Sequence, residues 1–331
     1  MTNVDIEGRT DRVPPSARRL PATSRRLLGA HMSIAGGFHL ALERGAALHC
    51  GAVQLFVKNQ RRWAAPRLTE DDVRAFQGAR RRTRIPVVFA HAAYLINLAA
   101  PGTAQWRQAV DAFTDELERA EALGLASVVI HPGSHGGEGV DAGLGRVVAA
   151  LDEVTRRTSG YRVKIALENT AGGGHTLGRT FAELAGMLDR AARPERLGVC
   201  IDTCHLFAAG YDIRRAAGWD AAFGECAERV GPDRVLAFHL NDSTGGLGSG
   251  LDRHEHIGWG ALGLGPFRRL LNAPAFARVP MVLETPKEPE PQADRRNLAT
   301  LRRLTREGRP VLRQTAARRA SHGLERVGER R

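Results

Sequence analysis

Short apolar runs alternate with longer amphipathic stretches along most of the chain. Each run ends in a polar or ionisable residue, and the stretches between runs are rich in Ala, Leu and Arg at helical spacing. The pattern therefore predicts strands that alternate with helices. The eight predicted strands are residues 27–31, 52–58, 87–91, 127–131, 163–168, 197–202, 235–241 and 280–284.

The stretches between these strands are long enough for helical crossovers between parallel strands. The clearest predicted helices are residues 69–82, 104–123, 141–157, 179–192 and 291–306. Eight β-then-α units in about 285 residues are typical of a closed barrel. We therefore predict an α/β fold, a single (β/α)8 TIM-type barrel, with an active site at the carboxyl ends of its strands. A doubly wound sheet is the alternative, but no Gly-x-Gly-x-x-Gly turn follows the first strand.

The two ends of the chain lack this periodicity. We predict a flexible extension over residues 1–26, which contain Pro and Arg, another over the basic residues 313–331, and a barrel domain over residues 27–312. The first extension carries a formal charge of +3 and the second +4, so together they hold most of the net charge of +12. Such tails fit solvated ends and a role in holding nucleic acid equally well.

The composition, with 43% apolar and 25% charged residues, is that of a soluble globular protein with a sizeable core. No apolar run approaches the roughly 20 residues that a membrane helix needs, and the first residues lack the apolar stretch of a signal peptide. We expect a cytoplasmic protein with no membrane partner. The four cysteines form no Cys-x-x-Cys pair, so neither a disulfide framework nor a thiolate zinc site is predicted.

Residues of the metal-ligating types stand at the ends of six predicted strands. Because strand ends converge on one face of a barrel, these side chains are expected to meet there. Their separations of 34 to 45 residues each correspond to about one β/α unit. A single strand-end histidine is more often structural, but six such residues together favour a metal site. The six are His91, His131, Glu168, Asp202, His239 and Glu284.

Three further candidate ligands lie close to these in sequence. His205 comes three residues after Asp202, and Asp252 and His254 fall on the same side of a predicted extended loop. Imidazole and carboxylate ligands suit zinc, and Mn²⁺ accepts them as well. Nine candidates exceed what one tetrahedral ion needs, which predicts a multinuclear site. Three divalent cations would outweigh the four carboxylates, and such a site favours a phosphodiester substrate and the activation of water.

Seven motifs follow one another in the order of a known family. They are Gly29-Ala-His31, Lys58-Asn-Gln-Arg61, His91 with Tyr94-Leu-Ile-Asn-Leu98, His131-Pro-Gly-Ser-His135, Glu168-Asn-Thr-Ala-Gly172, Asp202-Thr-Cys-His205, and His239-Leu-Asn-Asp242 with Asp252-Arg-His254. This series resembles the endonuclease IV family of zinc-dependent abasic-site (AP) endonucleases. The resemblance covers about residues 27–290 and leaves out only the tails.

The resemblance implies a hydrolase of the deoxyribonuclease IV type that acts in DNA base-excision repair. It would cut the phosphodiester 5′ to an abasic site in double-stranded DNA and leave a 3′-hydroxyl and a 5′-deoxyribose phosphate. A 3′-end-cleaning phosphodiesterase activity is expected as well. The implied cofactors are three Zn²⁺ per chain, with Mn²⁺ possible at one site, and a monomer would suffice. Glu168, which would bridge two of the ions, is the expected catalytic residue.

By the same resemblance, the nine ligands divide into three groups that share one carboxylate. The first group is His91, His131 and Glu168, the second is Glu168, Asp202, His239 and Glu284, and the third is His205, Asp252 and His254. The histidines that lie near the motifs without being ligands are expected to support ligands or structure. They are His31, His135 and His256.

The family also inserts side chains into the duplex at the lesion. Arg61, Tyr94 and Leu95 match those positions. Such wedge residues replace the stacking that is lost when the sugar is flipped toward the metals. Phosphate contacts are expected from the neighbouring residues Lys58, Asn59, Gln60 and Arg62.

Two other functions remain open from the sequence. A metal-dependent sugar isomerase or epimerase of the related barrel type would use Glu168, Asp202, His239 and Glu284 around one or two ions. It would leave the other five ligands unexplained. A non-catalytic nucleic-acid-binding protein would rely on the basic tails and would have no use for nine ligands. The number of ligands therefore favours the endonuclease.

Overall fold

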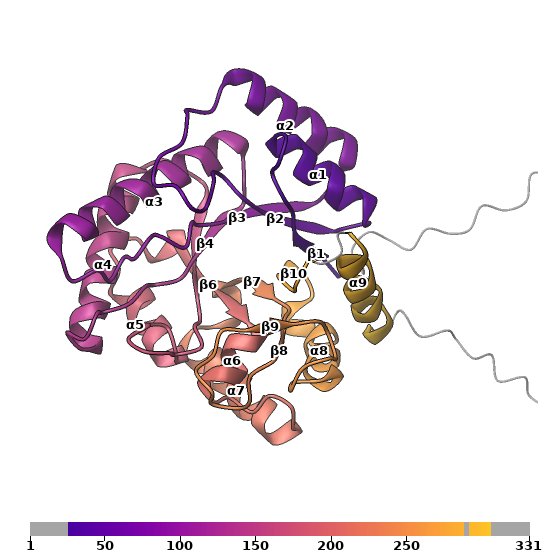
Figure 1. Ribbon diagram of the computed structural model, residues 1–331. Coiled ribbons are helices and arrows are strands. Elements are labelled where there is room, and N and C mark those ends of the chain that lie inside the picture. The colour runs from indigo at the N-terminus through magenta and orange to yellow at the C-terminus, as the bar shows by residue number, and fades with distance from the viewer. Residues whose placement is uncertain (1–25, 288–290, 306–331) are drawn as a thin grey trace, which may run out of the picture.

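The fold is a closed barrel of eight parallel strands, shown along its axis in Figure 1. The computed structural model describes residues 26–287 and 291–305. Going round the barrel, the strands follow their order in the sequence, and β10 closes the ring between β7 and β1. The barrel strands are β1 (Leu28–His31), β2 (Ala52–Phe56), β3 (Val87–His91), β4 (Ser127–Ile130), β5 (Lys164–Glu168), β6 (Leu197–Asp202), β7 (Val235–His239) and β10 (Met281–Leu283).

All eight predicted strands and the predicted barrel are confirmed. The predicted ends of several strands extend one or two residues too far, because the polar residues there already belong to the loops of the barrel mouth. Asn241, for instance, was predicted inside a strand that ends at His239.

Helices cover the outside of the barrel in the described part of the chain. They are α1 (Phe38–Ala47), α2 (Glu70–Thr83), α3 (Thr103–Leu123), α4 (Val140–Arg157), α5 (Phe181–Arg190), α6 (Thr203–Ala209), α7 (Ala216–Arg229), α8 (Leu264–Leu271) and α9 (Gln292–Leu304), with 3-10 turns η1 (Pro194–Arg196), η2 (Pro232–Arg234) and η3 (Pro274–Phe276). The five predicted helices begin and end within two residues of α2, α3, α4, α5 and α9. Local signals fix these ends: Thr69 and Asp72 form a capping box at the start of α2, and Gly124 takes a left-handed conformation at the end of α3.

The interior of the barrel is filled by one fully buried residue from each of seven strands. Because side chains alternate between the two faces of a strand, the residue two positions further along each strand also points inward, one layer closer to the mouth. This second layer carries the chemistry described below. The filling residues are Ala52, Phe89, Val129, Ala166, Cys200, Ala237 and Val282.

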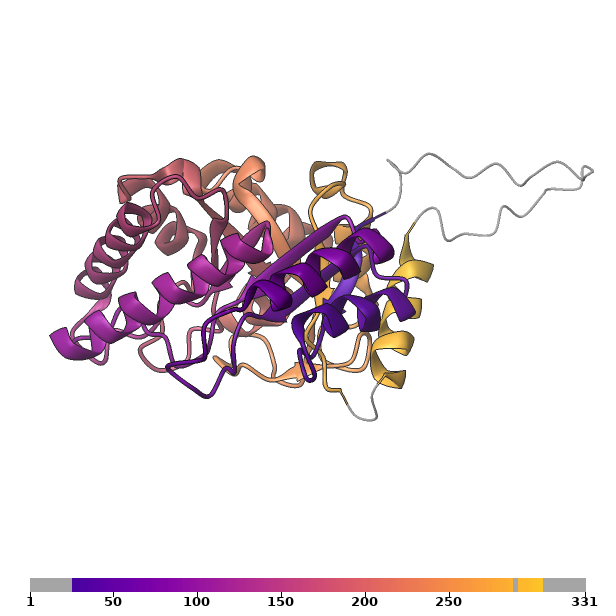
Figure 2. The same cartoon turned by 90° about the horizontal axis from the view of Figure 1, so that it is seen from above.

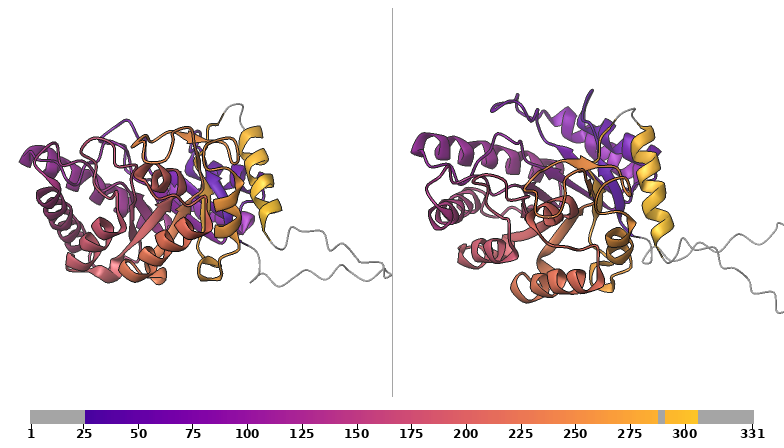
Figure 3. Two further views of the ribbon diagram at one scale, coloured as in Figure 1. Left: turned by 90° about the horizontal axis from the view of Figure 1, so that it is seen from below. Right: turned by 60° about the horizontal axis from the view of Figure 1, so that its bottom comes forward.

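The mouth of the barrel at the carboxyl ends of the strands is partly covered by a two-stranded antiparallel sheet. Its strands are β8 (Asp242–Ser243) and β9 (His254–Glu255). Figures 2 and 3 show this sheet on the same side of the barrel as the long loops that follow the strands. The side chains of these loops therefore surround the mouth.

The predicted extensions and the predicted location are not tested by the described residues. The predicted extensions lie outside the described residues apart from Arg26, as do residues 306–312 of the predicted barrel domain. Among the described residues, no helix is both long enough and apolar enough to cross a membrane. The expected cytoplasmic location stays a prediction.

Candidate metal centre

A ring of eight polar side chains forms the layer above the apolar filling of the barrel. Seven of them follow a filling residue by two positions, and His31 follows Gly29 in the same way. The alternation of side chains along a strand therefore directs all eight into the mouth. Six members are the predicted strand-end ligands. The two others are His31, a predicted supporting residue, and Gln54, which the sequence analysis did not single out. The ring is His31, Gln54, His91, His131, Glu168, Asp202, His239 and Glu284.

The nine predicted ligands come together in three groups of the kind that can hold a metal ion. Within each group, one donor atom of every residue lies within 4.8 Å of the others. The groups are His91, His131 and Glu168; Glu168, Asp202, His239 and Glu284; and His205, Asp252 and His254. Two further groups of this kind include a cysteine: Cys200 with Glu168 and His239, and Cys204 with Asp202 and His254.

Glu168 is fully buried and belongs to two of the three ligand groups through different oxygens. Its Oε2 lies 3.1 Å from Nε2 of His91 and 3.1 Å from Nε2 of His131. Its Oε1 lies 2.7 Å from Nδ1 of His239. A carboxylate in this position can bridge two cations, one at each oxygen.

In the third group, two imidazole nitrogens face each other beside a carboxylate. Nδ1 of His205 lies 2.9 Å from the Asn169 carbonyl, and Nδ1 of His254 lies 3.2 Å from the Glu284 carbonyl. A carbonyl only accepts, so each Nδ1 carries a proton, and Nε2 is the nitrogen that a cation can bind in place of any proton there. The two Nε2 atoms are 3.4 Å apart, with Oδ1 of Asp252 3.1 and 3.3 Å away. One cation could bind all three of these donor atoms, so the residues fit a metal.

Two other histidines are also oriented by a hydrogen bond to a protein oxygen. His91 donates from Nδ1 to the Ala92 carbonyl at 2.7 Å and points Nε2 at Glu168. His239 has the opposite tautomer, because its Nε2 lies 2.7 Å from Oε1 of Gln54 while its Nδ1 faces the carboxylates. Metal-ligating histidines typically donate their other ring N–H to a protein oxygen in this way. Each of these contacts therefore prepares a nitrogen lone pair for a cation.

Gln54 is the supporting residue that the sequence analysis missed. Besides its contact with His239, its Nε2 donates to Oε1 of Glu284 and lies 2.9 Å from Nδ1 of His31. The signal was available, since Gln54 follows Ala52 by two positions, as His91 follows Phe89. An amide is a poor metal ligand beside carboxylates and imidazoles, so a search for ligand types passes over it.

Each oxygen of Asp202 accepts a hydrogen bond from a different donor. Its Oδ1 accepts the backbone N–H of His205 at 2.9 Å and so caps helix α6. Its Oδ2 accepts from Nδ2 of Asn241 at 2.6 Å and lies 3.5 Å from Nε2 of His254. The cap also fixes the start of the helix that carries His205, so one carboxylate places ligands of two groups.

The groups strongly perturb one another's protonation. Burial alone raises the pKa of Glu168, but His239 and His131 outweigh it and hold that pKa well below its usual value. Burial likewise lowers the pKa of His205, yet Asp202 and Asp252 raise it well above its usual value. Glu168 is therefore ionised, and a proton competes with a divalent cation for the imidazole of His205.

Two cysteines lie next to the centre as buried thiols. Cys200 lies among the filling residues of the barrel and Cys204 at the start of α6, and both are buried. Burial raises the pKa of each thiol to about 12. Without a bound cation they are therefore protonated, whereas the thiolate is the form that binds zinc.

A cavity of about 440 Å³ opens above the centre. Its rim includes Tyr94 and Arg253, and its floor consists of ligands from all three groups. The Tyr94 side chain is 62% exposed, and its ring centroid is 5.5 Å from that of His91. Leu95 is exposed beside it. The predicted wedge residues of this loop therefore stand at the edge of the candidate centre.

The loop after β2 carries the other predicted DNA contacts, and its members differ in accessibility. Arg61 and Arg62 are exposed, as is Asn59, whose Oδ1 accepts the backbone N–H of Arg61 at 2.9 Å. Gln60 is half-buried. These side chains can reach a ligand that approaches the mouth.

Lys58, a predicted phosphate contact, is buried beneath this loop. Its Nζ lies 3.4 Å from Oε1 of Glu116 and 3.3 Å from Oδ2 of Asp115, and it donates to the Trp63 and Ala112 carbonyls. The structure therefore favours a different role from the predicted one: Lys58 anchors the loop to α3. The prediction relied on the composition of the motif, because a Lys–Asn–Gln–Arg run is typical of a phosphate-binding loop. The sequence does not show that the lysine of this run is buried.

The remaining predicted supporting histidines make structural contacts. Nδ1 of His135 accepts the backbone N–H groups of Gly137 and Gly139. His256 pairs with Asn297 of α9 at 3.0 Å. Neither belongs to a donor group, so both support loops, as expected.

Comparisons with known proteins agree with this geometry. Residues 42–304 match the family model described as a xylose isomerase-like TIM barrel. The chain is 48% identical over 278 residues to the probable endonuclease 4 of Chloroflexus aggregans, covering 84% of this chain and 97% of that protein. It is 45% identical over 279 residues to the probable endonuclease 4 of Geobacter sulfurreducens, covering 84% and 94%.

Solved structures give the same result. The crystal structure of endonuclease IV from Thermus thermophilus superposes with a TM-score of 0.76 at 37% identity, covering 85% of this chain and 98% of that one. A D-tagatose 3-epimerase-like protein superposes with a TM-score of 0.64 at 18% identity, covering 82% and 95%. At that identity the second likeness concerns the fold alone.

Proposed function

Because the chain belongs to the endonuclease IV family, we propose that it cuts DNA at abasic sites with a trinuclear zinc centre. The cut falls 5′ to the abasic nucleotide and leaves a 3′-hydroxyl and a 5′-deoxyribose phosphate. The same centre removes blocking groups from 3′ ends. The protein acts as a monomer, and Mn²⁺ can replace zinc at one site.

The observation that carries this proposal is the bridging position of Glu168 between two donor groups, with a third group at the same cavity. Bound divalent cations at such groups stabilise both the attacking and the leaving oxygen of an in-line displacement at phosphorus and activate water. The surrounding residues make the site ready in advance, because hydrogen bonds already fix four of the five imidazoles.

The loops around the mouth support a duplex substrate. In the described part of the chain, every exposed large apolar side chain lies in a segment that follows the carboxyl end of a barrel strand or at the start of the next helix. These residues are Trp63, Tyr94, Leu95, Val140, Leu247, Leu251, Trp259 and Leu264. Tyr94 lines the cavity above the donor groups, and we infer that Tyr94, Leu95 and Arg61 fill the space left by an extruded sugar.

A sugar isomerase or epimerase fits these observations less well. Such an enzyme would occupy the group that contains Asp202 and Glu284, and would leave the pair of facing imidazoles at His205 and His254 without a purpose. The number of metals per chain separates the two functions.

The direct test is the nicking of duplex DNA that carries one abasic analogue. We expect the zinc-loaded protein to cut this strand once, to leave a 3′ end that a polymerase extends, and to spare an undamaged duplex. Elemental analysis after gentle purification should find three zinc ions per chain. A count near one, with sugar turnover and intact DNA, would favour the isomerase instead.

Two variants make this test specific. Glu168→Gln keeps the shape of the side chain but weakens the bridge, so it should lose both cutting and bound metal. Glu138→Gln alters an exposed carboxylate, paired with Arg146, on the same side of the barrel, and should retain both. If Glu168→Gln cuts as well as the parent protein, the proposed centre is wrong.

A further inference from the structure

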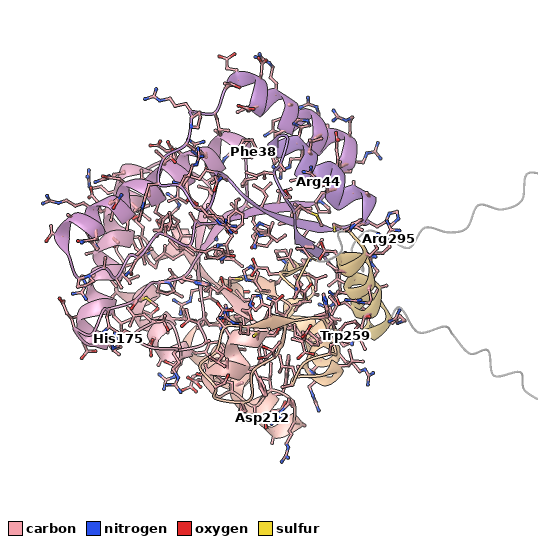
Figure 4. All side chains as sticks on the ribbon, in the orientation of Figure 1. Phe38, Arg44, His175, Asp212, Trp259 and Arg295 are labelled. Atoms are coloured by element: carbon pink, nitrogen blue, oxygen red, sulfur yellow. The ribbon has the colours of Figure 1, made fainter. Side chains whose placement is uncertain are left out.

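An exposed tryptophan stacked on an arginine stands beside the barrel mouth, outside the donor groups. The Trp259 side chain is 63% exposed, and Cζ of Arg296 lies 4.0 Å from the centroid of its ring. Trp259 follows β9, and Arg296 projects from the second turn of α9. Figure 4 shows Trp259 between the β8–β9 sheet and α9.

The loop that carries Trp259 is rigid because it is built around a buried carboxylate. Asp242 accepts the backbone N–H groups of Gly258 at 2.9 Å, Leu262 at 2.9 Å and Ser243 at 2.8 Å. At Gly260 a Cβ atom would come within 2.3 Å of the Ser243 carbonyl oxygen, so the chain passes too close for any larger residue. The indole is thus held in place rather than carried on a loose loop.

The same segments carry metal ligands, which places the pair on the substrate side. Asp242 comes three residues after His239, and Trp259 five residues after His254. Helix α9 begins eight residues after Glu284. The Trp259–Arg296 pair is therefore tied to the three elements that bring ligands to this part of the mouth.

The charge around the pair suits an anion. Within the described residues, no carboxylate forms an ion pair with Arg296, and the nearby Asp294 is bound to Lys287 at 2.8 Å. Arg295 and Arg296 are both exposed. A guanidinium that stacks on an indole keeps its edge N–H groups available for a phosphate.

From these observations we propose that Trp259 and Arg296 bind the DNA duplex on one flank of the abasic site. The indole packs against the deoxyribose and base edges of the groove, and the guanidinium contacts the adjacent phosphate. This pair binds undamaged flanking DNA and does not touch the reacting phosphate. The inference rests on the proposed function and adds to it a second contact area beyond the wedge loops.

The test measures DNA binding and cutting separately. Trp259→Ala and Arg296→Ala should each raise KM on abasic DNA by about fivefold and leave kcat unchanged. The dissociation constant for undamaged duplex, measured by fluorescence anisotropy, should rise by a similar factor. Arg296→Ala should also reduce the salt dependence of binding by about one released counterion, whereas Trp259→Ala should leave it unchanged.

Arg303→Ala is the matched control. Arg303 is exposed on the same helix, two turns further from the mouth, and its removal changes the net charge equally. It should bind and cut DNA as the parent does. Trp259→Phe should retain most of the affinity, since a ring remains for the groove and for Arg296.

Three results would decide against parts of this picture. If the parent nicks abasic DNA and both alanine variants bind and cut equally well, the inference fails while the proposed function stands. If Arg303→Ala weakens binding as much as Arg296→Ala, the effect is one of net charge and the inference also fails. If the parent binds duplex through Trp259 and Arg296 but never nicks it, the inference stands and the proposed function fails.

Discussion

Replacing Lys58 with methionine should destabilise the fold rather than simply weaken DNA binding. Lys58 and Glu116 face each other with side chains that are each only 1% exposed. Methionine keeps the length of the aliphatic stem and removes the cation. The Glu116 carboxylate is then left buried, with the backbone N–H of Ala93, 3.2 Å from its Oε1, as its remaining hydrogen-bond donor.

The size of the effect follows from the burial of both charges. Two unit charges 3.4 Å apart attract each other by about 5 kcal/mol at an effective dielectric constant of about 20. Removing one partner of a buried pair typically costs about 3–5 kcal/mol, because the other charge stays in the interior. We expect the free energy of unfolding to fall by that amount near neutral pH.

The loss should depend on pH. Burial raises the pKa of Glu116 above its usual value, and Lys58 opposes this rise. Without Lys58 the folded-state pKa rises further, so the folded variant binds a proton that the unfolded chain releases. The proton on Glu116 stabilises the folded variant fully at a pH below the pKa of Glu116 in the unfolded chain. This stabilisation is lost as the pH rises through the pKa of Glu116 in the folded variant. The deficit relative to the parent should therefore be larger at pH 8 than at pH 5.

Chemical denaturation measured at one zinc concentration provides the assay, because bound metal stabilises both proteins by linkage. The double variant Lys58→Met with Glu116→Gln should recover most of the lost stability, since no charge remains buried. Arg62→Met, on the same loop but exposed, should leave stability unchanged and weaken DNA binding. If Lys58→Met unfolds like the parent and only its salt-dependent DNA affinity falls, Lys58 is a surface phosphate contact and the reasoning is wrong.

Two further predictions concern the centre itself. Gln54→Ala removes the acceptor for Nε2 of His239 and should lower metal affinity by about tenfold. Competition with a chromophoric chelator measures this affinity. An unchanged affinity would show that other contacts orient the His239 ring. Tyr94→Ala should change the free energy of unfolding by less than about 0.5 kcal/mol, because the side chain is 62% exposed. The same variant should sharply reduce kcat/KM on abasic DNA. Equal activity would show that Tyr94 is not a wedge residue.

The sequence predicts the strands and the positions of the six strand-end candidate ligands because both depend on the same repeat. A strand that feeds a barrel must alternate inward and outward residues, so a ligand two positions after a filling residue, such as His91 after Phe89, reaches the mouth wherever the backbone is a strand. This rule needs no knowledge of neighbouring strands. The division of the ligands into groups depends on which strands are neighbours. At the level of sequence, only the family resemblance indicated this division.

Features that depend on packing between distant segments could not be predicted in this way. The sequence shows Lys58 in a polar motif, but it does not show that a carboxylate 58 residues later occupies the space beneath the loop. Trp259 is a similar case: its indole is exposed because Asp242 fixes its loop and Arg296 comes from another helix. Each of these contacts joins side chains that are far apart in the chain.

The buried carboxylate of Glu116 links the two loops that carry the predicted wedge residues. It holds Lys58 at the base of the loop that leads to Arg61, and it accepts the backbone N–H of Ala93, next to Tyr94. The two loops leave neighbouring strands, β2 and β3, whose ends are already paired. A shared anchor fixes the loops relative to each other as well as to the barrel. The relative positions of Arg61 and Tyr94, the predicted wedge residues, are thus set by a contact inside the fold.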